Sequence, residues 1–235
     1  MIHVIPLWNT ITGLELYSST MASQSMEIII FDVQPRVIKE TQSLLTNSEW
    51  NDALSTLKEQ DGVRTAYWGQ TIESQDKVYL LIDWISAQHC VKFKQSQSFK
   101  TFLTNLDLII LGSPQSIHVP IAPQMCLPIF RDGLTEIAIF SSYNSSFIET
   151  FDNFSSIIKN SPGCTGIMKD IARSEISGEM GEIEGSEQLY VAMIGWLDLE
   201  AHRIAMESKG FKDNVPSVEA CVQEIIVYHI KMIMV

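Results

Sequence analysis

Two stretches of the chain follow one pattern: Val78-Tyr-Leu-Leu-Ile-Asp-Trp84-Ile-Ser-Ala-Gln-His89 and Tyr190-Val-Ala-Met-Ile-Gly-Trp196-Leu-Asp-Leu-Glu-Ala-His202. In each stretch an apolar run typical of a β-strand ends at a tryptophan, and a histidine follows. A phenylalanine follows further along, at Phe99 in the first copy and at Phe211 in the second. The period of roughly 110 residues is too long for a solenoid and indicates a duplicated domain.

Each copy ends on another histidine. His118 lies in Ser-Ile-His-Val-Pro, and His229 lies in Val-Tyr-His-Ile-Lys. Half of the eight prolines crowd into the fifteen residues 114–128, where the first copy ends, which favours a boundary between the copies there. The expected parts of the chain are an extension over 1–25, a first unit over 26–120, a linker over 121–133 and a second unit over 134–235.

Hydrophobic periodicity predicts the same order of elements in both units. In the first unit, strands are expected over 26–33, 63–72, 78–84 and 117–119, and helices over 36–60, with a break near 46–48, and 86–103. In the second unit, strands are expected over 135–140, 164–172, 189–196 and 225–234, and helices over 147–159 and 199–208. An acidic, glycine-rich insertion over 177–188 has no counterpart in the first unit and is interpreted as a solvated loop or a lid. The order βαββαβ is the ferredoxin-like arrangement, so the predicted class is α+β.

Composition argues against several classes of function. The chain has 235 residues, of which 16 are basic and 28 acidic, giving a net charge of −12. This balance argues against binding nucleic acid or an anionic membrane, since both need clustered lysine and arginine. Charged residues make up only 19%, below the usual ~25%, which predicts a wide core, a dimer interface or an apolar pocket. No apolar run reaches the ~18 residues that suggest a transmembrane helix, and the N-terminus lacks the basic start of a signal peptide. We therefore expect a cytoplasmic protein.

Sequence motifs for cofactors and metals are missing. The chain contains no glycine-rich nucleotide-binding motif and no GxSxG or HExxH. The four cysteines are scattered without a CxxC pair, which argues against zinc: Cys90, Cys126, Cys164 and Cys221. We therefore expect no cofactor and no metal.

The two tryptophan segments carry a resemblance to a known family. The chain resembles the dimeric α+β barrel superfamily, and especially the fungal proteins related to antibiotic-biosynthesis monooxygenases. The second copy matches the usual Trp-x-x-x-Glu-Ala-His run from Trp196 to His202. The first copy departs from it, because His89 lies one residue nearer to Trp84 and Gln88 replaces the glutamate.

The resemblance implies an architecture as well as a range of activities. Two ferredoxin-like units pair their sheets face to face, with the helices outside. Most members achieve this as homodimers, so a tandem chain implies an intramolecular dimeric α+β barrel, with a homodimer of the whole chain as a further assembly. Members often hold a ligand between the sheet and the helices of one unit. Their activities include cofactor-free oxygenation, cyclisation, isomerisation, decarboxylation and haem chemistry, so the fold alone does not select one.

We expect a cofactor-independent enzyme of secondary metabolism that acts on an apolar polyketide or terpenoid intermediate. Cyclisation or isomerisation, including pericyclic (Diels–Alder-type) ring closure, fits best, because such reactions need orientation and one or two hydrogen bonds more than a nucleophile. Two alternatives remain open. One is a cofactor-free monooxygenase that oxidises an aromatic polyketide, and the other is a non-catalytic small-molecule-binding or stress protein.

Candidate site residues come from the histidines and from the positions at which the copies differ. Histidine is the side chain whose ordinary pKa suits proton transfer near neutrality. The candidate catalytic residues are His118, Asp83, Tyr79 and His229. The candidate substrate-binding residues are Tyr67, Trp68, Trp84, His89 and Phe93. The unmatched polar and aromatic positions of the first unit are where a single active site is expected. The alternative is structural, since the histidines can be hydrogen-bonded within the fold and the aromatic rings can be ordinary core residues.

Overall fold

The computed structural model describes residues 24–41, 44–120, 129–131, 133–175 and 188–235. Residues 1–23 of the expected extension, residues 121–128 and 132 of the linker, and the acidic insertion up to residue 187 lie outside the described residues. Within the described part of the chain, no helix is both long and apolar enough to span a membrane.

The first half of the protein contains four strands and the helices between them. The strands are β1 (Ser25–Val33), β2 (Val63–Gln70), β3 (Lys77–Trp84) and β4 (Ile110–Pro120). The helices are α1 (Pro35–Thr41), the 3-10 turn η2 (Leu44–Thr46), α2 (Ser48–Lys58), α3 (Ala87–Lys94) and α4 (Gln97–Asp107). The side chain of Asn47 accepts a hydrogen bond from the Trp50 amide and so caps α2.

The second half repeats this order and adds a short final strand. The strands are β5 (Leu134–Ser141), β6 (Cys164–Glu175), β7 (Gln188–Trp196), β8 (Glu224–Ile230) and β9 (Ile233–Met234). The helices are α5 (Phe147–Lys159), α6 (Leu199–Glu207) and α7 (Lys209–Glu219). Helix α5 places Phe147, Phe151 and Phe154 at helical spacing, and all three side chains are buried.

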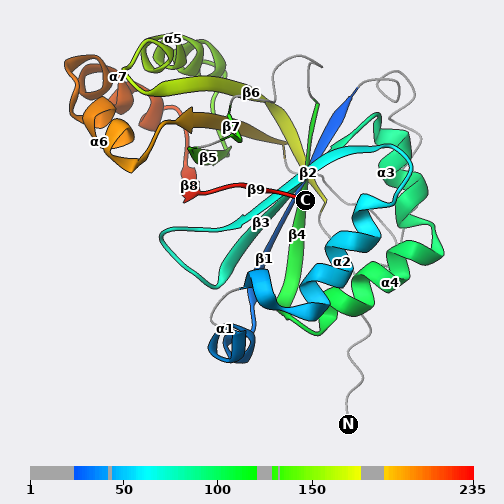
Figure 1. Ribbon diagram of the computed structural model, residues 1–235. Coiled ribbons are helices and arrows are strands. Elements are labelled where there is room, and N and C mark those ends of the chain that lie inside the picture. The colour runs from blue at the N-terminus through cyan, green and yellow to red at the C-terminus, as the bar shows by residue number, and fades with distance from the viewer. Residues whose placement is uncertain (1–23, 42–43, 121–128, 132, 176–187) are drawn as a thin grey trace.

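All the strands belong to one sheet of nine strands, counted over the described residues, in the order β8-β5-β7-β6-β4-β1-β3-β2-β9. Each neighbouring pair is antiparallel. The order β4-β1-β3-β2 in the first half corresponds to β8-β5-β7-β6 in the second. Strand β4 pairs with β6, and β9 carries the chain from β8 across to β2 at the other end of the sheet. The sheet therefore closes into an α+β barrel, with α2–α4 and α5–α7 on different sides of the molecule (Figure 1).

Three apolar clusters fill this architecture. The central cluster takes side chains from both halves, among them Met26 and Tyr79 from the first and Met193 and Ile230 from the second. A second cluster lies between the first-half strands and α2–α4, and a third lies between the second-half strands and α5–α7. Because side chains alternate along a strand, each strand has one side toward the central cluster and one toward the helices.

Several boundaries differ from the sequence-based expectation. The helix expected over 86–103 is two helices, because the chain turns at Ser96, whose hydroxyl accepts the Phe99 amide hydrogen bond at 3.1 Å. The strand expected over 117–119 extends over the whole of β4. The strand expected over 225–234 is interrupted between β8 and β9. Helix α7, which contains Pro216, was not expected.

Candidate functional site

Two polar clusters occupy matching places on the helix-facing side of the sheet. Each is built around a glutamate on the first strand of its half, Glu27 on β1 or Glu136 on β5. The indole nitrogen of Trp84 donates to Glu27 Oε2 at 3.2 Å, and that of Trp196 donates to Glu136 Oε2 at 2.8 Å. The recurring tryptophan therefore orients a carboxylate in both halves, buried at Glu27 and partly buried at Glu136.

The last strand of each half adds a histidine beside that glutamate. In the sheet register, Glu27 lies opposite His118 on β4, and Glu136 lies opposite His229 on β8. The residue six positions after each tryptophan, on the following helix, completes the set: it is Cys90 on α3 and His202 on α6. His202 thus corresponds in position to Cys90 and not to His89.

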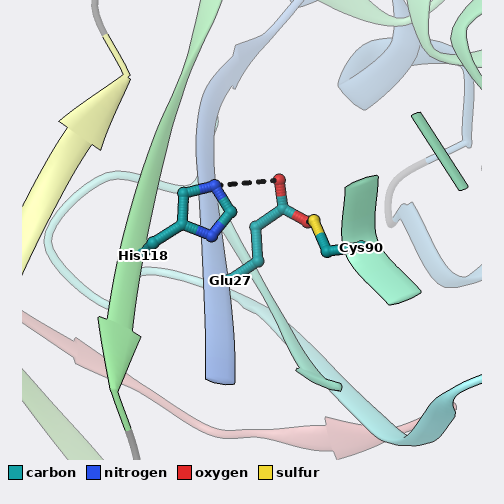
Figure 2. Close-up of side chains that lie close together, drawn as sticks. All are labelled: Glu27, Cys90 and His118. Carbon is teal, nitrogen blue, oxygen red and sulfur yellow. Dashed lines mark hydrogen bonds and ion pairs between the residues drawn. The ribbon is translucent and has the colours of Figure 1, made fainter. Parts of the chain in front are cut away.

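In the first cluster the carboxylate has a full set of partners. The ammonium group of Lys94 lies 2.9 Å from Glu27 Oε1, and the Ser116 hydroxyl donates to the same oxygen at 2.9 Å. The Cys90 thiol lies 3.3 Å from Oε2, and His118 Nε2 lies 3.9 Å from Oε1. Figure 2 shows the Glu27 carboxylate between the His118 ring and the Cys90 sulfur. An exposed fraction of 2% for the Glu27 side chain and 10% for that of Lys94 makes this a buried ion pair.

The second cluster holds two imidazole rings against its carboxylate. His202 Nε2 lies 3.4 Å from Glu136 Oε2, and the centroids of the His202 and His229 rings are 4.6 Å apart. Glu73, from the turn between β2 and β3, reaches across from the first half. Its carboxylate accepts the His229 backbone amide at 3.1 Å and lies 2.5 Å from His229 Nδ1. Nδ1 therefore faces an acceptor, which favours the tautomer with a lone pair on Nε2.

Two histidine ring nitrogens of the second cluster have no hydrogen-bond partner among the described residues. These atoms, His202 Nδ1 and His229 Nε2, are both buried. A buried polar atom without a partner is costly and rare in folded proteins, so each such atom needs an explanation. Two unpartnered nitrogens in one cluster mark the second cluster as a place where something else binds.

The sequence differences between the halves account for this contrast. Ten positions after the tryptophan, the first half has Lys94 and the second has Met206. Two positions before the strand histidine, the first half has Ser116 and the second has Val227. Two of the groups that saturate Glu27 thus have apolar residues at the corresponding positions of the second half. Met206 and Val227 have exposed fractions of 38% and 37%, so these positions are also open to solvent.

Burial dominates the electrostatics of the second cluster. It raises the pKa of Glu136, although the hydrogen bond from Trp196 opposes the rise. It lowers the pKa of His202 to about 4, with an additional contribution from the charge of His229. Burial also acts to raise the pKa of Glu73, but the hydrogen bonds from His229 outweigh it and the pKa is lowered. His202 is therefore a neutral imidazole near pH 7.

The candidate site residues expected from the sequence lie on opposite faces of the sheet. Tyr67 and Tyr79 belong to the central cluster, and Asp83 faces the same side, since it alternates with Tyr79 along β3. Burial raises the pKa of Tyr79 and that of Asp83, which accepts a hydrogen bond from Gln24 at 2.8 Å. The remaining first-half residues Trp68, Trp84, Phe93 and His118 face the helices.

The expected residues therefore do not form one site. His118 lies in the first cluster and His229 in the second. Phe93 packs against Trp84 with ring centroids 5.7 Å apart. His89 belongs to neither cluster, because its ring contacts Ser86 at 2.9 Å and Asp61 at 3.8 Å at the start of α3.

Sequence reasoning missed the carboxylates at the centre of both clusters. Glu27 and Glu136 are the only charged residues in the runs Met-Glu-Ile-Ile-Ile and Thr-Glu-Ile-Ala-Ile, and a charge in such a run was an available signal. Glu73 gave no signal, because it is a turn residue that joins the cluster only through the contact between the two halves.

Comparison with solved structures identifies the fold. A proposed monooxygenase from Fusobacterium nucleatum superposes with a TM-score of 0.62 at 12% identity, over 91% of this chain and 94% of that one. An anthrone oxidase-like protein gives a TM-score of 0.62 at 13% identity, over 90% and 92%. A proposed monooxygenase from Lactobacillus acidophilus gives 0.55 at 10% identity, over 90% and 95%. No protein-family model matches the sequence, and neither does any curated protein. At these identities the likeness concerns the fold alone: the chain has the α+β barrel fold of these monooxygenase-like proteins.

Proposed function

We propose that the protein is an enzyme of secondary metabolism that cyclises or isomerises an apolar small molecule at the second cluster. The observation that carries this proposal is the pair of buried, unpartnered nitrogens of His202 and His229. We further propose that residues 26–120 and 134–235 are tandem ferredoxin-like units that form the barrel within one chain. The matching strand orders and the pairing of β4 with β6 and of β9 with β2 support this organisation.

The second cluster is suited to hold an oxygen atom of the substrate. His229 Nδ1 and His202 Nε2 each face a carboxylate, so the open nitrogen of each ring carries a lone pair and accepts a hydrogen bond from a substrate hydroxyl or enol group. By accepting that hydrogen bond and its proton, the nitrogen raises the electron density of the carbon skeleton, which speeds a double-bond shift or a ring closure before the proton is returned. Such rearrangements conserve all atoms of the substrate, so they need no further reactant.

The surroundings of the second cluster favour an apolar skeleton. Along β8, Ile225 and Val227 lie on the same side as His229, and both are 37% exposed. Met206 adds a third partly exposed apolar side chain from α6. A polyketide or terpenoid chain would bury these groups while its oxygen reaches the imidazoles, and a surface that fixes the reactive conformer lowers the barrier further.

The test compares the same substitution at two histidines, one inside the second cluster and one outside both clusters. Metabolites that accumulate in the producing organism when the gene is deleted supply the substrate, and the purified protein is then assayed for its conversion. His229→Asn keeps a donor toward Glu73 but removes the open nitrogen, and we expect it to lose about 100-fold or more in rate. His89→Asn, outside both clusters, should keep full activity. Equal rates for both variants would reject the site, and an absence of conversion by the unmodified protein would reject the activity.

Cofactor-free monooxygenation is the second candidate, because the chain matches an anthrone oxidase-like protein over nearly its full length. Oxygen consumption during turnover of an aromatic substrate separates this reaction from an isomerisation. Tight binding of the accumulated metabolite without any product would instead indicate the third alternative, a small-molecule-binding protein.

A further inference from the structure

We propose that the second cluster binds a divalent first-row transition-metal ion through Glu136, His202 and His229. One carboxylate oxygen and one ring nitrogen from each histidine lie within 4.8 Å of one another. Two imidazoles and a carboxylate form one of the ligand sets that zinc takes in catalytic sites, and they leave further coordination positions open. A similar set holds iron in oxygenases.

The spacing of the ligand atoms fits such an ion. Zinc binds histidine nitrogen and carboxylate oxygen at about 2.0–2.2 Å, so two ligands at a tetrahedral angle are roughly 3.4 Å apart. His202 Nε2 and Glu136 Oε2 are separated by 3.4 Å. His229 Nε2 is the third donor, and it is buried without a partner.

Glu73 completes the arrangement from outside. Metal-binding histidines usually donate their second ring N–H to a carboxylate, which fixes the tautomer and turns the other nitrogen toward the metal. Glu73 stands in this relation to His229 Nδ1, at 2.5 Å, and also holds the backbone amide of the same residue. This turn of the first half therefore acts as a positioning element for a ligand of the second.

In the first cluster, a lysine ammonium group occupies the position that corresponds to the proposed metal site. There, the ammonium group of Lys94 lies 2.9 Å from the Glu27 carboxylate and 3.4 Å from His118 Nε2. The matching position of the second half is Met206, which has no charge. Among the described residues, no lysine or arginine pairs with Glu136, whose carboxylate lies 3.4 Å from Nε2 of the neutral His202 ring. The second half thus keeps the carboxylate and the strand histidine, has an imidazole nitrogen donor in place of Cys90, and lacks the built-in cation.

The bound ion has a defined role if the proposed function holds. An open coordination position polarises a carbonyl oxygen, which the lone pair of an imidazole nitrogen does not do. This role rests on the proposed function, whereas metal binding does not. The inference replaces the sequence-based expectation of a protein without metal.

The test titrates Zn²⁺ into the full-length protein by calorimetry, without substrate. The protein is purified without a polyhistidine tag and treated with a chelator beforehand. We expect one site per chain. Met206→Lys, which introduces the ammonium group of the first half, should weaken binding by at least 100-fold, while the matched variant Met206→Leu should bind as the unmodified protein does. His229→Asn should also weaken binding by at least 100-fold. Circular dichroism checks that all variants are folded.

The outcomes separate the possibilities cleanly. Stoichiometric binding that survives both Met206→Lys and His229→Asn but is lost in Cys90→Ser would place the ion in the first cluster and overturn the proposal. The absence of any Zn²⁺ binding to the folded, unmodified protein would overturn it as well. Neither result depends on turnover, so a protein that binds no metal can still isomerise its substrate, and one that binds metal can still fail the activity assay.

Discussion

The contrast between the two clusters predicts a large effect of Lys94→Met on stability. This substitution gives the first half the residue that the second half has at Met206. The Glu27 carboxylate, 2% exposed, would lose an ammonium group at 2.9 Å and keep the hydrogen bonds from Trp84 and Ser116. Removing one partner of a buried ion pair costs about 3–5 kcal/mol. For a chain of this length, each kcal/mol lowers Tm by roughly 2–4 °C, so Tm should fall by roughly 6–20 °C.

Urea unfolding followed by tryptophan fluorescence measures this effect directly. Lys209→Met is the matched control, because Lys209 pairs with Asp213 on the surface of α7, and it should unfold at the same urea concentration as the unmodified protein. The double variant Lys94→Met/Glu27→Gln removes the buried charge and should recover most of the loss. If Lys94→Met unfolds within about 1 kcal/mol of the unmodified protein, the interpretation of the first cluster as a tightly paired, structural site is wrong.

Three further predictions follow from individual residues. Burial raises the pKa of Asp83 above 3.8, so the stability that comes from its protonated form is fully present below that pH and is lost as the pH rises through the folded-state pKa. Asp83→Asn should therefore be more stable than the unmodified protein in urea unfolding at pH 7, and this advantage should disappear below about pH 4. Lower stability of the variant at pH 7 would contradict this. A Cβ atom at Gly195 would lie 2.1 Å from Thr165 Oγ1 and 2.9 Å from the Ile129 backbone, so Gly195→Ala should lower the free energy of unfolding by about 1–3 kcal/mol in thermal unfolding. A Cβ atom at Gly112 would meet no neighbour within 4 Å, so Gly112→Ala measures only the strain of a side chain at a backbone φ of +77°. Glu73→Gln should lower the Zn²⁺ affinity about 10–100-fold in calorimetry without unfolding the protein, and an unchanged affinity would show that Glu73 does not orient His229.

The fold could be predicted largely from the repeat. The strand–tryptophan–helix order around Trp84 and Trp196 placed most elements, because burial of one face imposes a strong period on strands and helices. The break between α3 and α4 at Ser96 and the break between β8 and β9 were not predicted. A capping hydroxyl and a two-residue interruption leave the hydrophobic pattern nearly unchanged. Helix α7 was not expected, and it contains Pro216, a residue type that disfavours the interior of a helix.

The site was harder to predict, because the sequence differences that mark it are not the ones that the comparison of the two copies singled out. Asp83 and Gly195 differ, but the backbone of Ile129 packs against Gly195, so this difference has a structural cause. The informative differences are Lys94 against Met206 and Cys90 against His202, and they become visible only when the strand register places Glu27 and Glu136 beside them. No local pattern in one sequence reveals which side of a strand faces the helices in both halves at once.

The central claim is that the first cluster is filled by its own lysine while the second is open to a cation. A crystal structure of the full-length protein grown with Co²⁺ and recorded at the cobalt absorption edge tests it most directly. The account predicts one anomalous peak per chain, bounded by Glu136, His202 and His229, with no peak beside Lys94. A peak at Glu27, Cys90 and His118, or a second cluster without cobalt in such crystals, would contradict it.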